Sequence, residues 1–237
     1  MRVTPFRITP QNTVAPNPIR PNLAIMSTNA PADATIHAFW RVLAESGWHG
    51  LTMRAIAAEA AIPLATLRRQ AACPFGLLIA HQRMVDAAVL AGTVEDLTST
   101  PRDRLFDVLM RRMDALQIDR AGVLRLLHDL PRAPLVAVFL AQRLPGAMAW
   151  MLEAAGLDAG GPSGALRAKG LGVVWLAGLR AWEKDESEDL SATMAALDRA
   201  LDQADRVARM LRFAPKELMP DADAEPSPDA EPSPDPV

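Results

Sequence analysis

Residues 51–70 read LTMRAIAAEAAIPLATLRRQ, and this stretch decides the fold expected for the chain. Thr52 stands directly before a short helical run, where its hydroxyl can accept a backbone N–H that the first turn leaves without a partner. Ile62 and Pro63 break that run, and proline is tolerated at the first position of a new helix. Two short helices joined by a tight turn are typical of a helix-turn-helix unit.

Apolar residues at helical spacing predict further helices on both sides of this unit. One runs from Asp33 to about Gly47, and another from about Phe75 to Ala91. Five more are predicted at about 102–116, 120–129, 135–155, 165–184 and 190–212. No strand pattern appears in the sequence, so the predicted fold class is all-α.

Length and composition favour a folded body with two unstructured ends. Half of the 237 residues are hydrophobic, which is enough to bury a substantial core. We predict a disordered N-terminal arm at 1–32 and a disordered, acidic, proline-rich tail at 213–237, with the folded parts at 33–90 and 100–212. Translation from Met1 and from Met26 both fit the sequence of the arm.

Charge neither supports nor excludes a nucleic-acid partner. The net charge is −3, but from Pro215 onward seven acids face the single base Lys216. The first thirty residues carry three arginines and no acid, which leaves the middle of the chain near neutrality. Any binding of DNA would therefore depend on a local basic patch.

Residues 36–78 resemble the DNA-binding domain of the TetR family of transcriptional regulators. The matching segments are Ala38-Phe39 with Gly47, Leu51 to Ala57, Ala60 to Ile62, Ala65 to Leu67, and Leu77-Leu78. The resemblance implies a three-helix helix-turn-helix domain followed by a helical ligand-binding and dimerisation domain. It also implies a cytoplasmic, homodimeric, ligand-responsive repressor whose partners are a double-stranded DNA operator and an apolar small molecule or lipid.

The resemblance places candidate DNA contacts on the two short helices. They are Thr52, Arg54, Leu64, Ala65, Thr66, Arg68, Arg69 and Gln70. The sequence departs from the family where an aromatic residue and a lysine are usual, because it has Ala71 and Pro74 there. Arg68 and Arg69 can compensate, since guanidinium groups bind phosphates and guanine edges. The alternative is that these residues form an ordinary solvated helix face.

Two further sets of candidate residues lie in the second half of the chain. Large apolar side chains predicted to line a ligand pocket are Phe139, Met148, Trp150, Met151 and Trp175. Their alternative role is simple core packing. Residues 165–184 are apolar nearly all round, which predicts burial on several sides by the same domain or by a partner subunit. The apolar stripe on 190–212 predicts contact with one partner helix, and the resemblance implies a four-helix dimer bundle. The predicted interface residues are Val174, Leu179, Trp182, Leu190, Met194, Leu197 and Leu201.

Two other functions remain open at this point. Several segments resemble the TetR-fold, lipid-binding accessory protein of ubiquinone biosynthesis, which does not bind DNA; they include Trp150 to Gly156, Arg167 to Lys169 and Trp182 to Ser187. A general dimeric interaction module is the third possibility.

The sequence contains no pattern that indicates catalysis. It lacks a nucleophile elbow, a phosphate-binding loop and a paired zinc-binding motif, so we expect no enzyme activity, no cofactor and no metal. Cys73 is the only cysteine, so no intrachain disulfide forms. The longest strongly apolar run, Gly170 to Leu179, is shorter than the roughly 20 residues of a membrane span, and none is expected.

Overall fold

The computed structural model describes residues 31–93 and 98–210. The predicted tail, and all but the last two residues of the predicted arm, lie outside the described residues. The helices of the described part are α1 (Asp33–Gly50), α2 (Met53–Glu59), α3 (Leu64–Gln70), α4 (Pro74–Gly92), α5 (Pro101–Gln117), α6 (Arg120–Asp129), α7 (Pro134–Ala154), α8 (Gly161–Lys184) and α9 (Ser191–Met210), with a short 3-10 helix at Leu130–Arg132. The prediction of an all-α fold is confirmed.

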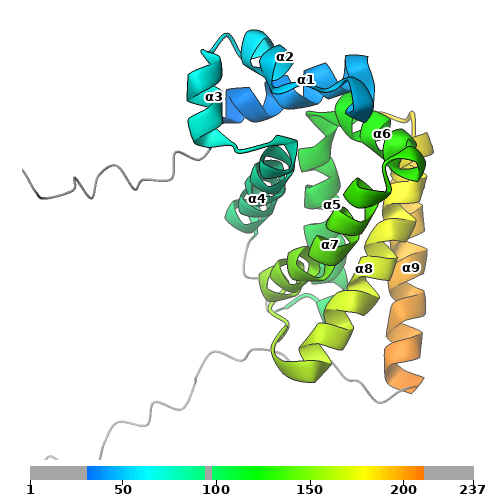
Figure 1. Ribbon diagram of the computed structural model, residues 1–237. Helices are drawn as coiled ribbons and strands as arrows, with labels where there is room; N and C mark the ends of the chain where they lie inside the picture. Colours follow the sequence, from blue (N-terminus) through cyan, green and yellow to red (C-terminus); the bar gives the residue numbers. More distant parts are fainter. Residues whose placement is uncertain (1–30, 94–97, 211–237) are drawn as a thin grey trace, which may run out of the picture.

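The helices form a small head and a larger body. Figure 1 shows α1, α2 and α3 together at one end of the molecule, with α4 leading from them toward the other helices. The long helices α8 and α9 pack side by side in the body, and α1 of the head lies against α6. We call α1–α3 the head and α5–α9 the body, joined by α4.

Local sequence explains where several helices begin and break. Gly47 has φ +68, a left-handed conformation that interrupts α1 where the sequence predicted its end, although one more turn follows. Thr100 accepts a hydrogen bond from the backbone N–H of Asp103 and caps α5. The predicted start of α8 at 165 is wrong, because Pro162 fits in the first helical turn and the helix begins at Gly161.

One continuous core joins the head to the body. Phe39, Leu43 and Ile56 of the head are fully buried in the same cluster as Met113 and Leu197 of the body. By length and composition alone, α7 passes as a membrane-spanning helix, and it is the one helix of the described residues that does so. It packs against α4, α5 and α8, and 28% of its most apolar window is buried.

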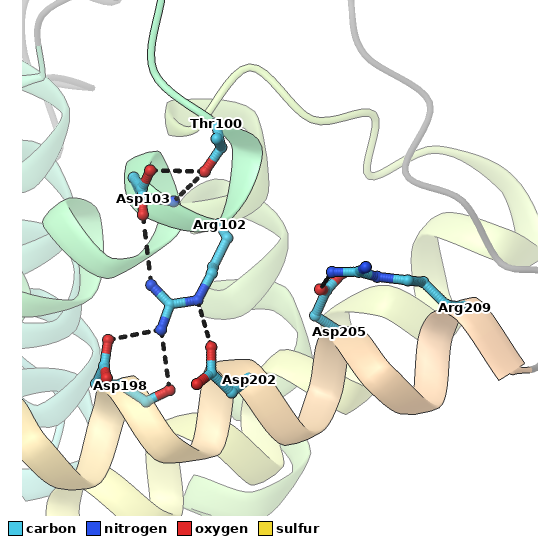
Figure 2. Close-up of polar contacts among 7 residues, drawn as sticks. All are labelled: Thr100, Arg102, Asp103, Asp198, Asp202, Asp205 and Arg209. Atoms are coloured by element: carbon cyan, nitrogen blue, oxygen red, sulfur yellow. Dashed lines mark hydrogen bonds and ion pairs between the residues drawn. The ribbon is translucent and has the colours of Figure 1, made fainter.

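An arginine at the start of α5 fastens α9 to the body (Figure 2). Arg102 donates from Nε to Asp202 at 2.7 Å and from Nη2 to Asp198 at 2.6 Å. Hydrogen bonds to Asp198 and Asp202 raise the pKa of Arg102 above its already high ordinary value. Further along α9, Asp205 pairs with Arg209 across one helical turn. Because Arg102 bridges two acids one turn apart, it fixes α9 in register against α5.

Candidate nucleic-acid interface

The turn between α2 and α3 is built from a cap, a left-handed residue and a proline. Thr52 Oγ1 accepts a hydrogen bond from the backbone N–H of Ala55 at 3.1 Å, as the sequence predicted. Ala61 has φ +52, a conformation that costs a residue with a side chain roughly 1–2 kcal/mol. Pro63 then precedes the first turn of α3. This geometry sets α3 at an angle to α2 on the outside of the head.

Helix α3 buries one residue and exposes most of the others. Leu67 is fully buried and anchors the helix to the head. Leu64 is 45% exposed, and Ala65, Arg68 and Arg69 are exposed with it. The outward face of α3 therefore carries a small apolar patch at its N-terminal end and two cations near its C-terminal end.

The polar side chains of α3 differ in how freely they reach solvent. Arg69 Nη2 donates to Thr66 Oγ1 at 3.2 Å, which holds this guanidinium along the helix. Gln70 Oε1 accepts a hydrogen bond from Thr35 Oγ1 of α1 at 3.2 Å, so Gln70 faces the head rather than outward. Within the described part of the chain, no hydrogen bond or ion pair engages Arg68. Among the predicted contacts on α3, Arg68 is therefore the most available and Gln70 the least.

Helices α1 and α2 each carry one arginine, and only the arginine of α1 forms an ion pair. Arg41 Nε donates to Glu59 Oε1 at 2.5 Å, so the one acid of α2 is neutralised. Arg54 is exposed and has no ion-pair partner among the residues that the structure describes. Arg54 and Arg68 are therefore unpaired cations of α2 and α3, while the head as a whole, with four arginines and the acids Asp33, Glu45 and Glu59, has a net charge of +1.

A cluster of aromatic side chains joins α1, α4 and α7. Ala71, where the resembling family has an aromatic residue, is 5% exposed. Phe75 instead packs edge-on against Trp48 of α1, with ring centroids 5.4 Å apart. It also packs edge-on against Phe139 of α7 at 4.8 Å. Sequence reasoning missed this cluster, because its members come from three helices far apart in the chain.

A close helix contact joins the head to the body. Gly122 of α6 lies so near α1 that a Cβ there would sit 2.5 Å from the carbonyl oxygen of Trp40. No larger residue fits at this distance without a shift of one helix. The absence of a side chain at Gly122 therefore sets how closely α1 approaches α6.

A buried carboxylate adds polar contacts at the same junction. Asp119, between α5 and α6, accepts hydrogen bonds from Nδ1 of His37 of α1 at 2.9 and 3.0 Å. The Nε2 atom of His81 of α4 lies 3.5 Å from the same carboxylate. Burial raises the pKa of Asp119, but the imidazoles of His81 and His37 outweigh it and hold the pKa below its usual value. The three groups link head, α4 and body.

A second carboxylate fastens the other end of α1. Asp129 at the end of α6 accepts the backbone N–H of Trp48 at 2.8 Å, next to the break at Gly47. That hydrogen bond, assisted by Arg125, lowers the pKa of Asp129 against the opposing effect of burial. The head is therefore held to α6 at both ends of α1, and its orientation follows that of the body.

The residues predicted to line one ligand pocket differ in burial and in their neighbours. Met148 and Met151 are fully buried core residues. Trp175 is buried beneath the guanidinium of Arg112, 5.2 Å from its ring. Phe139 belongs to the aromatic cluster with Phe75, and Trp150 is 56% exposed. Three of these residues are thus buried in the core and Phe139 supports the head, and a pocket formed by all five stays a prediction.

The predicted dimer-interface residues face the subunit's own interior. Val174, Trp182, Leu190, Leu197 and Leu201 are buried, and Leu179 and Met194 are half-buried. The apolar stripes on α8 and α9 pack against each other and against the rest of the body. The structure contains both helices that were predicted to form the interface. The predicted interface residues, however, pack against other helices of the same subunit. The large apolar residues exposed on these helices are Leu166, Val173, Leu176, Val207 and Met210.

Comparison with known proteins assigns the fold. No model of a protein family matches the sequence, and no curated protein matches it. The structure is similar to that of a TetR transcriptional regulator from Nitrosomonas europaea, with 22% identity and a TM-score of 0.60, covering 73% of this chain and 97% of that one. It is also similar to a TetR transcriptional regulator from Rhodococcus sp. RHA1, with 19% identity and a TM-score of 0.53, covering 73% and 93%. The chain therefore has the all-α fold of TetR regulators.

Proposed function

We propose that this protein is a homodimeric, DNA-binding transcriptional repressor that reads its operator with α3. The observation that carries the proposal is the helix-turn-helix geometry of α2 and α3 with Arg68 exposed and unpaired on the outer helix. In such units the second helix enters the major groove, and arginine is the commonest reader of guanine there. A regulator of this kind acts in the cytoplasm, together with the DNA.

The charges of α2 and α3 support a DNA partner over a solvated helix face without a partner. Arg54 and Arg68 are free for phosphate or base contacts, while the carboxylate of Glu59 is occupied by Arg41. The exposed Leu64 and Ala65 suit thymine methyl groups in the major groove. Gln70 is bonded to α1, so we leave it out of the proposed contacts.

The surface of α8 supports dimerisation through a face other than the one that the sequence predicted. Leu166, Val173 and Leu176 are exposed along one helix, at 47%, 69% and 42%. Gly170 between them has open space around its Cβ position, which lets another helix approach closely. Two heads related by a two-fold axis would bind half-sites about one turn of DNA apart.

The proposal includes a small-molecule ligand bound in the body. Such a ligand changes operator affinity only through a difference in its affinity for two arrangements of the heads. The contacts of α1 with α6 would carry that change, since they fix the head to the body. The lipid-binding helper of ubiquinone synthesis gains no support from the two solved structures, both of which are transcriptional regulators.

A mobility-shift assay over a salt series tests the proposal. The purified protein is incubated with DNA fragments from its own gene neighbourhood and with random DNA of equal length. We expect saturable binding to one fragment, a steep loss of affinity as salt rises, and loss of binding in Arg68→Ala/Arg69→Ala. The matched control is Arg199→Ala/Arg206→Ala, which removes the same charge from the exposed surface of α9. Equal affinity of wild type for every fragment would refute operator recognition.

A further inference from the structure

An open groove of about 640 Å³ lies between α4 and α7, and Trp150, one of the residues predicted to line a ligand pocket, is on its wall. Its volume falls in the range of ordinary small-molecule pockets. Residues of α4 on its wall include Arg83, Asp86 and Leu90, and residues of α7 include Arg143 and Trp150. The groove therefore offers both charged and apolar contacts to one ligand.

The uncompensated charge of this groove is positive. Its acid, Asp86, is ion-paired with Arg112, a buried residue of α5. Arg83 is exposed and has no ion-pair partner among the described residues. Arg143 donates from Nε to Gln82 Oε1 at 2.8 Å, a neutral partner that leaves its charge uncancelled. Two guanidiniums from facing helices thus remain available to an anion.

Each wall of the groove also carries an exposed apolar side chain. Trp150 is 56% exposed and Leu90 is 37% exposed, which are high fractions for large apolar side chains. Gly146 contributes no side chain, and a Cβ there would meet no atom within 4 Å. A flat ring or an acyl chain can therefore lie on α7 beside Trp150.

We propose that this groove binds an amphipathic organic anion, such as an aromatic or acyl carboxylate. The acid group lies between Arg83 and Arg143, because guanidinium forks bind carboxylates through two parallel hydrogen bonds. The apolar part covers Trp150 and Leu90. The charged groove adds an acid group to the apolar small molecule or lipid that the resemblance implied.

This site is placed to act on the head. The ligand bridges α4 and α7, and three residues separate the start of α4 at Pro74 from the end of α3 at Gln70. A ligand that holds α4 against α7 restricts the position of α3. The regulatory consequence rests on the proposed function, whereas ligand binding itself does not.

Two fluorescent probes that differ by one acid group test the inference. They are 8-anilino-1-naphthalenesulfonate and its neutral counterpart N-phenyl-1-naphthylamine, titrated into the full chain without DNA. We expect the sulfonate to bind wild type with one dominant site and about tenfold more weakly to Arg83→Gln or Arg143→Gln, as expected for one lost charge-assisted hydrogen bond. The Arg143→Lys variant should recover part of the affinity, since it restores the charge.

Further variants separate this groove from other apolar surfaces. Trp150→Ala should weaken both probes, whereas Arg83→Gln should weaken only the sulfonate. Arg206→Gln on α9 removes a charge far from the groove and should leave both affinities unchanged. Equal sulfonate affinity in wild type, Arg83→Gln and Arg143→Gln would overturn the proposal. A protein that binds the sulfonate as expected but no DNA would instead overturn the proposed function alone.

Discussion

Replacing Gly122 by alanine should loosen the junction between the head and the body. The new Cβ would sit 2.5 Å from the carbonyl oxygen of Trp40 and 2.9 Å from Cε3 of its ring. The ring can move by rotation, but the carbonyl belongs to the backbone of α1. Helix α1 must therefore move away from α6, and the packing of the head against the body is lost in part.

The size of the effect follows from two opposing contributions. Overpacking a well-filled contact costs about 1–3 kcal/mol. Alanine in place of glycine within a helix stabilises by roughly 0.8–1 kcal/mol. Gly146→Ala provides the matched control, because Gly146 is also helical and its Cβ would meet no atom within 4 Å. The difference in unfolding free energy between the two variants isolates the overpacking and should be about 1–3 kcal/mol.

Urea denaturation followed by circular dichroism at 222 nm measures this difference. Wild type and both variants are compared at one protein concentration and without ligand, since a dimer's stability depends on concentration. Gly146→Ala should be at least as stable as wild type, and Gly122→Ala the least stable of the three. If Gly122→Ala matched Gly146→Ala, the close packing of α1 on α6 would be refuted.

Three further changes probe the cap, the buried carboxylate and the exposed face. Thr52→Ala removes the cap of α2 and should lower the unfolding free energy by about 1 kcal/mol in the same urea assay, whereas Thr52→Ser should keep most of it. The pKa of Asp119 is lower in the folded state, so its contribution is present above the unfolded pKa and is lost as pH falls through the lower folded value. Stability of Asp119→Asn should therefore fall less steeply than that of wild type below about pH 4, and equal slopes would contradict the contact with His37 and His81. Val173→Glu places a charge on the exposed face of α8 and should give a monomer by sedimentation velocity; a dimer unchanged in mass would exclude that face.

The helix-turn-helix unit could be predicted from the sequence because its signals are local. Each signal depends on a few neighbouring residues: the cap at Thr52, the break at Ile62-Pro63 and the stop near Gly47. The structure has a helix boundary or a helix interruption at all three places. The left-handed Ala61 in the turn gave no such signal, since alanine rarely adopts that conformation.

The partners of apolar faces could not be predicted in the same way. Periodicity shows that one side of α9 is apolar, but it does not say whether a helix of the same chain or of another covers it. Leu197 and Leu201 are covered from within the subunit, whereas Val173 of α8, which is not among the predicted interface residues, is exposed.

Contacts between distant segments were the least predictable. The histidines appeared scattered in the sequence, yet His37 and His81 meet at Asp119 because three elements converge there. The charge of the groove between α4 and α7 likewise depends on Arg112 of α5 neutralising Asp86, a pairing without a sequence signature.

Selection of binding sites from a random DNA library tests the central claim most directly. The account predicts that the wild-type protein enriches one motif made of two half-sites about one helical turn apart. It also predicts that Arg68→Ala loses preference at a guanine within that motif while Arg199→Ala/Arg206→Ala does not. If the wild-type protein enriches no motif, the claim that α3 reads DNA is contradicted.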